Sequence, residues 1–63
     1  MNEYTISLSY KIGEKMKFKA GSLEEAKQEA VSFAEERLVC GSSEVSYEVL
    51  GPNDEYAEGE IHG

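Results

Sequence analysis

Apolar and polar residues alternate over the first twelve residues of the chain. The apolar positions are Tyr4, Ile6, Leu8, Tyr10 and Ile12. A period of two gives a β-strand one apolar face and one polar face. Beyond a turn predicted at Gly13 and Glu14, Met16, Phe18 and Ala20 alternate with three lysines in the same way. The pattern therefore predicts two strands joined as a hairpin.

The apolar spacing changes to three and four residues after Ser22, which indicates an amphipathic helix. The Ser22 side chain can cap the first free amides, and Glu25 completes a capping box. The apolar stripe comprises Leu23, Ala26, Ala30, Phe33, Ala34 and Leu38. Gly41 is typical of a left-handed helix end. We expect about four turns of helix, with alanines small enough to lie close to a sheet.

A second pair of strands follows the helix. Val45, Tyr47 and Val49 alternate with polar residues, and the sequence from 51 to 54 (GPND) has several turn signals. The last strand, from Tyr56 to Ile61, is predicted less clearly because a glycine interrupts it. The expected fold is a single α+β domain over residues 1–63 with the order β-β-α-β-β. A helix covering one face favours an antiparallel sheet with strand order 2-1-3-4.

Charge is distributed unevenly along these elements. The net charge is −7, and residues 38–63 contain six acidic side chains with no Lys or Arg. Four lysines on the first hairpin are expected to share its solvent face: Lys11, Lys15, Lys17 and Lys19. The overall acidity disfavours binding to nucleic acid or anionic membranes and favours basic proteins as partners. Nucleic-acid binding by the lysine hairpin stays open as an alternative.

The candidate partner-binding residues are those of the acidic C-terminal half. They are Glu44, Glu48, Asp54, Glu55, Tyr56, Glu58 and Glu60. Residues two apart on a strand project to the same side about 6.6 Å apart, so the last two glutamates can imitate successive phosphates. Tyrosine is frequent among interface hot spots, which makes Tyr56 a candidate anchor, whereas Tyr47 is expected in the core. The alternative is a polar rim that protects an edge strand.

The residues that most enzymes use are missing from the sequence. His62 is the single histidine and is next to the last residue, where we expect poor order, and no nucleophile or phosphate-binding motif occurs. We therefore expect no enzyme activity, no metal and no cofactor. Cys40 is the single cysteine and is interpreted as a small apolar residue. Without disulfides, a leader or a membrane span, the expected location is the cytoplasm.

The segment from Phe18 to Lys27 (FKAGSLEEAK), set between two hairpins, resembles small phage-encoded anti-CRISPR proteins of β-β-α-β-β layout. That resemblance implies an inhibitor that binds a CRISPR effector in the bacterial host and covers its DNA-contacting lysines. The same segment resembles the sheet-to-helix junction of HicB-type antitoxins, which implies a basic, RNA-binding toxin as partner. We therefore expect a non-catalytic acidic protein that docks on a basic nucleic-acid-binding surface. The alternative is a small homodimerising domain whose acidity serves solubility.

Overall fold

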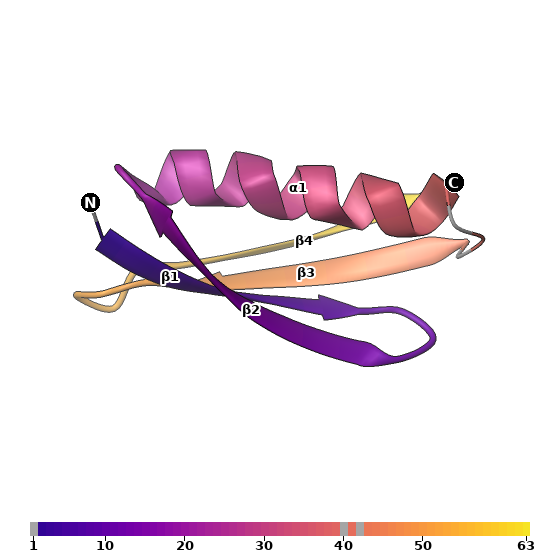
Figure 1. Ribbon diagram of the computed structural model, residues 1–63, viewed down its shortest axis with the longest axis horizontal. Helices are drawn as coiled ribbons and strands as arrows, with labels where there is room; N and C mark the ends of the chain where they lie inside the picture. The colour runs from indigo at the N-terminus through magenta and orange to yellow at the C-terminus, as the bar shows by residue number, and fades with distance from the viewer. Residues whose placement is uncertain (1, 40, 42) are drawn as a thin grey trace.

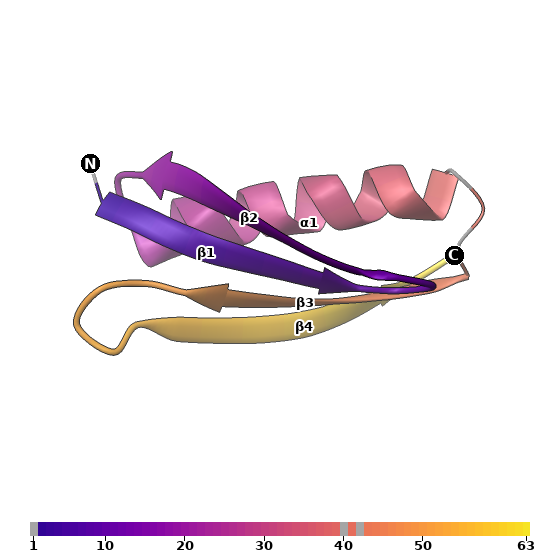
Figure 2. The same ribbon diagram turned by 60° about the horizontal axis from the view of Figure 1, so that its bottom comes forward.

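The computed structural model describes residues 2–39, 41 and 43–63. Its elements are β1 (Asn2–Ser9), β2 (Gly13–Ala20), α1 (Leu23–Val39), β3 (Glu44–Leu50) and β4 (Tyr56–His62). The strands form one antiparallel sheet in the order β2-β1-β3-β4, and α1 lies along one face of it (Figure 1, Figure 2). The predicted α+β fold and strand order are confirmed. The prediction for Cys40 lies outside the described residues.

The core lies between α1 and the sheet. It consists of Tyr4, Ile6, Leu8, Ala20, Ala26, Ala30, Ala34, Val45, Tyr47 and Val49. The three helix alanines are fully buried, which confirms that small side chains bring the helix close to the sheet. At the β2 edge, Phe18 and Phe33 close the core with rings packed edge to face, their centroids 6.4 Å apart.

The first turn lies earlier than the alternation predicts. β1 ends at Ser9 and β2 begins at Gly13, so the predicted strand to Ile12 and the predicted turn at Gly13 and Glu14 are wrong. Ile12 is 65% exposed instead of continuing the apolar face. Just after this turn, the Glu14 carboxylate accepts hydrogen bonds from both Tyr10 and Arg37. This contact ties the start of β2 to the last turn of α1.

The predicted helix ends are confirmed by their hydrogen bonds. The backbone N–H of Glu25 donates to Ser22 Oγ over 3.3 Å, as in an N-cap. At the other end, Gly41 has a φ of 110° and its N–H donates to the Leu38 carbonyl.

Among the described residues, no helix has the length and apolar character that crossing a membrane requires.

Two glycines of the second hairpin leave room for tyrosine rings. A Cβ on Gly51 would lie 2.3 Å from the Tyr4 ring, and a Cβ on Gly59 would lie 2.3 Å from the Tyr47 hydroxyl. Gly59 is directly opposite Tyr47 in the β3–β4 pairing. The glycine that weakens the sequence pattern of the last strand therefore has a packing role.

Candidate functional site

Four carboxylates lie together on the face of the sheet that α1 does not cover, which we call the helix-free face. They belong to Glu44 and Glu48 of β3 and to Glu58 and Glu60 of β4, and all four side chains are exposed. Alternation along each strand gives them one direction, because residues an even number of positions apart project to the same face. We call these four residues the acidic face.

The strand register sets two members of the acidic face directly opposite each other. Glu48 is directly opposite Glu58, and Glu60 is opposite Ser46, whose hydroxyl donates to the Glu60 carboxylate over 3.3 Å. Like charges directly opposite on a sheet are destabilising. The Glu48–Glu58 pair therefore has an unfavourable arrangement that packing within the fold does not require.

Tyr56 partly compensates for this repulsion. Its hydroxyl lies 2.9 Å from Glu48 Oε2 and also contacts Glu58 Oε2. These hydrogen bonds, first to Glu58 and then to Glu48, hold the pKa of Tyr56 well above its ordinary range. A phenol has one hydrogen and can donate to one carboxylate at a time. Some of the negative charge at this pair therefore stays available to an external cation.

At the other end of the acidic face, His62 lies between two carboxylates. Its Nε2 is 2.9 Å from Glu60 Oε1, and its Nδ1 is 3.6 Å from Glu44 Oε2. The three residues offer donor atoms within 4.8 Å of one another, so they are the described residues most suited to hold a cation. The two imidazole nitrogens face different carboxylates, and all three side chains are exposed. This geometry suits hydrogen bonding better than a closed metal site.

Sequence reasoning discounted His62 because it is close to the C-terminus. In the structure β4 extends through His62, and the N–H of Gly63 donates to the Ser43 carbonyl. The expected poor order at this end is wrong, because the last strand pairs along its whole length with β3. The signal that could have found His62 is its spacing of two from Glu60, which gives both side chains the same direction on a strand.

The helix-free face also contains a hollow and an apolar pair beside the carboxylates. A shallow hollow of about 520 Å³ is lined by Ser7, Ser9, Ser46, Glu48, Glu58 and Glu60, among others. Toward the β3–β4 turn, Leu50 and Tyr56 are paired across the strands and are 48% and 46% exposed. Three serines and three glutamates therefore line the hollow, and the Leu50–Tyr56 pair lies next to it toward the turn.

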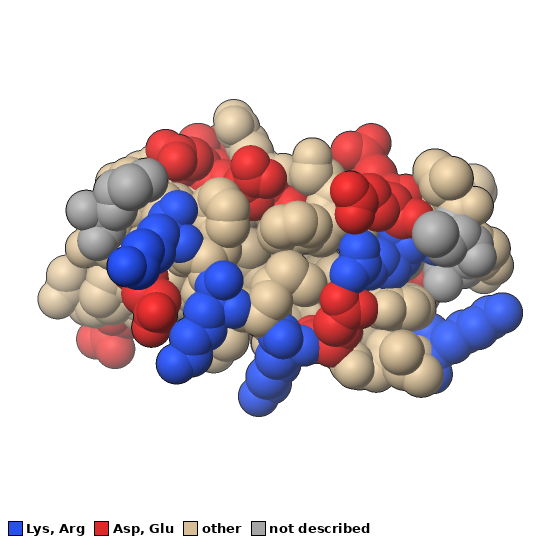
Figure 3. All heavy atoms as spheres, in the orientation of Figure 1, with Lys and Arg blue, Asp and Glu red and all other residues tan. Residues whose placement is uncertain are grey.

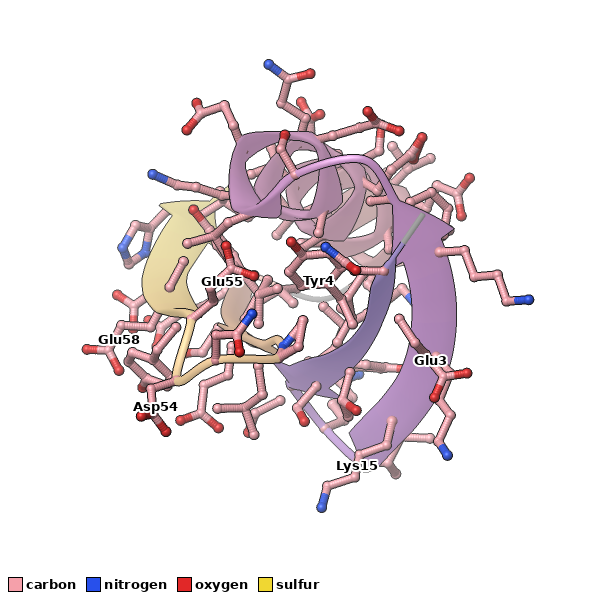
Figure 4. All side chains as sticks on the ribbon, turned by 90° about the vertical axis from the view of Figure 1, so that its left-hand side faces the viewer. Glu3, Tyr4, Lys15, Asp54, Glu55 and Glu58 are labelled. Atoms are coloured by element: carbon pink, nitrogen blue, oxygen red, sulfur yellow. The ribbon has the colours of Figure 1, made fainter. Side chains whose placement is uncertain are left out.

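Two of the predicted site residues lie apart from the acidic face. Asp54 is exposed in the β3–β4 turn, where its φ is 63°. Glu55 points to the helix side and accepts a hydrogen bond from the Tyr4 hydroxyl over 2.9 Å (Figure 4). The prediction that Glu55 joins one acidic edge is therefore wrong, because this carboxylate is hydrogen-bonded to the buried Tyr4. Glu58 projects away from that pair, and Tyr47 lies in the core as predicted.

The lysines of β2 are exposed on the same helix-free face but at the opposite edge of the sheet. One row across the strands contains Lys15, Ser7, Glu48 and Glu58 in that order. Lys11 lies in the turn and does not belong to the strand alternation. Figure 3 shows basic side chains along the β2 side and acidic ones over the helix. The helix-free face is therefore positive at one edge and negative at the other.

The four carboxylates lie exposed on an open face of the sheet. Comparison with protein-family models, curated proteins and solved structures finds no match to this chain. The grounds for a function are therefore the chemistry and geometry of the helix-free face.

Proposed function

We propose that this chain is a non-catalytic binding protein whose acidic face docks on the basic, nucleic-acid-binding surface of a larger protein and blocks it. The observation that carries the proposal is the convergence of Glu44, Glu48, Glu58 and Glu60 on one exposed face of two adjacent strands. The resemblance of the β-β-α-β-β sequence pattern to anti-CRISPR proteins is the reason for proposing a CRISPR effector as the partner.

The spacing of the carboxylates supports imitation of a nucleic-acid backbone. Residues two apart on one strand are separated by about 6.6 Å, close to the distance between successive phosphates, and neighbouring strands add a second row about 4.8 Å away. Lysines and arginines that normally contact phosphates would meet carboxylates at similar intervals. Such complementary charge raises the association rate and selects against acidic partners.

An apolar contact beside the charges supports a specific complex. Leu50 and Tyr56 form an exposed pair at the end of the acidic face. Buried aromatic anchors account for much of the affinity in protein interfaces, whereas exposed rim charges mainly affect the rate of encounter. In the proposed complex the carboxylates select a basic surface and the Leu50–Tyr56 pair extends the lifetime.

The test compares two variants of equal net charge. One carries Glu58→Lys and Glu60→Lys on the acidic face, and the other carries Glu24→Lys and Glu35→Lys on exposed positions of α1. Each double change moves the net charge from −7 to −3, since each replacement adds two. Tagged wild-type protein captures nucleic-acid-binding proteins from a bacterial lysate containing CRISPR effectors, and the Kd of each variant for the purified partner is then measured.

The proposal expects the acidic-face variant to lose at least about tenfold in affinity, while the helix variant binds like wild type. Equal losses in both variants would mean that only net charge matters. Unchanged binding by the acidic-face variant would show that the partner uses another surface.

A further inference from the structure

The sheet has two free edges, at β2 and at β4. These strands are the outer members of the order β2-β1-β3-β4, as Figure 2 shows, and α1 covers a face and not an edge. An edge strand presents backbone N–H and C=O groups that can pair with another strand. Each edge is therefore able to accept a strand from a second molecule.

The two edges carry opposite charge on the helix-free face. β2 exposes Lys15, Lys17 and Lys19 there, and β4 exposes Glu58 and Glu60. Lys17 is only loosely paired within the molecule, with its Nζ 3.8 Å from Glu3 Oε1 and 72% of its side chain exposed. The lysines are thus available to a carboxylate from outside.

We infer that a second copy of this chain docks edge to edge, with β4 of one molecule pairing with β2 of the next. All neighbouring strands in the sheet are antiparallel, so β2 and β4 run in opposite directions. A copy displaced sideways across the sheet therefore brings β4 beside β2 in the antiparallel sense that the sheet already uses. The helices of both copies stay on the same side. This inference does not depend on the proposed function.

One pairing register sets every residue of β4 opposite a residue of β2 and also matches their charges. It places Glu58 opposite Lys17 of the second copy and Glu60 opposite Lys15, with Tyr56 opposite Lys19. In this register Ala57 is opposite Phe18, so residues that face the helix in one copy also meet residues that face the helix in the other. Opposite charges directly across antiparallel strands are favourable.

Pairing of like edges is disfavoured by the same rule. Two β4 edges would set glutamates against glutamates, and two β2 edges would set lysines against lysines. The attractive arrangement is heterologous, and each added copy presents a new free edge, so association yields an open row of molecules and not a closed dimer.

The net charge of −7 opposes association but does not prevent it at moderate salt. Four strands at about 4.8 Å place the centres of neighbouring copies roughly 19 Å apart. The Debye length at about 0.15 M ionic strength is roughly 8 Å, so repulsion between centres is mostly screened. Charge pairs across the new strand contact are about 5 Å apart and are screened much less.

The experiment is sedimentation velocity over a concentration series up to the millimolar range, at about 0.15 M ionic strength. Wild-type protein should show a mean mass that rises with concentration beyond that of a dimer. Lys17→Glu and Glu58→Lys should each weaken this association roughly tenfold, because each replaces an attractive pair by a repulsive one. Far-ultraviolet circular dichroism verifies that both variants fold.

Mixing the two variants is the decisive part of the experiment. The acidic β4 of the Lys17→Glu protein is complementary to the unchanged β2 of the Glu58→Lys protein, and the reversed edges are complementary to each other. The equimolar mixture should therefore associate about as strongly as wild type, while each variant alone stays roughly tenfold weaker. A wild-type protein that stays monomeric throughout, or a mixture that stays as monomeric as its components, overturns the inference.

In this design the proposed function and the proposed self-association can be refuted independently of each other. Lys17→Glu leaves the acidic face intact, so it should still bind a basic partner while it loses self-association. Loss of partner binding in Glu58→Lys, without any self-association in wild type, would support the proposed function alone.

Discussion

Replacing Gly59 by alanine should destabilise the protein, because the ring of Tyr47 occupies the space that a methyl group would take. The new Cβ would lie 2.3 Å from the Tyr47 hydroxyl oxygen, 2.5 Å from Cζ and 2.9 Å from Cε2. Carbon atoms in contact are normally about 3.5–4.0 Å apart. The ring or the β4 backbone must therefore move by about 1 Å or more.

The cost of this movement follows from where the ring lies. Tyr47 is 8% exposed and belongs to the core, so its ring has little free space to move into. Overpacking of a core costs about 1–3 kcal/mol. A chain of this length has a total stability of roughly 3–9 kcal/mol. Each kcal/mol shifts the Tm of such a domain by about 4–8 °C, so a cost of about 2 kcal/mol lowers it by roughly 8–16 °C.

The assay is thermal and urea unfolding of matched variants. Gly13→Ala is the control, because a Cβ at Gly13 meets no atom within 4 Å. Its unfolding free energy should stay within about 0.5 kcal/mol of wild type or rise slightly. In a Tyr47→Val background the ring is gone, and Gly59→Ala should then cost almost nothing. An unchanged Tm for Gly59→Ala, or an equal cost with and without the Tyr47 ring, would refute the packing argument.

Two further predictions concern local contacts. Ser22→Ala should lower the free energy of unfolding in urea by about 1 kcal/mol, because the Glu25 N–H loses its cap, while Ser22→Asp should retain most of it; equal losses in both would contradict the capping role. The hydrogen bonds from Arg37 and then Tyr10 hold the pKa of Glu14 below its ordinary value of 4.5. This contribution to stability is therefore complete above pH 4.5 and is lost as the pH falls through the lower folded-state pKa. Glu14→Gln should flatten the acid branch of a plot of urea midpoint against pH, and an unchanged acid branch would exclude this pair as its cause.

Much of the fold follows from local patterns. Alternation from Tyr4 to Leu8 and from Val45 to Val49 predicts strands whose apolar residues are buried in the structure. The Ser22 cap and the glycine at position 41 define the helix ends. The position of the helix between two hairpins then leaves few ways to order the strands. These features depend on residues that are close together in the sequence, so one sequence is enough to predict them.

The features that sequence reasoning missed depend on contacts between distant residues. The early turn after Ser9 is accompanied by a contact between Glu14 and Arg37, which are 23 positions apart. Glu55 lies away from the acidic face, where its carboxylate accepts a hydrogen bond from Tyr4, 51 positions away. Neither partner is visible in a local pattern, so Glu14 is interpreted from the sequence as a turn residue and Glu55 as part of the acidic surface.

The face on which the site residues lie was more predictable than the contacts between them. Glu58 and Glu60 share a face by strand alternation alone, as predicted. Their convergence with Glu44 and Glu48 needed the β3–β4 register, which depends on the length of the intervening turn. The hydrogen bonds of Tyr56 to two opposed carboxylates also follow from this register.

The most direct test of the central claim is a competition measurement with the captured partner. Labelled nucleic acid is bound to that partner, and this protein is titrated into the complex while the fluorescence anisotropy of the label is followed. Wild type and the Glu24→Lys, Glu35→Lys variant should release the nucleic acid completely, whereas the Glu58→Lys, Glu60→Lys variant should release little. Simultaneous binding of the nucleic acid and wild-type protein to the partner would contradict docking of the acidic face on the nucleic-acid-binding surface.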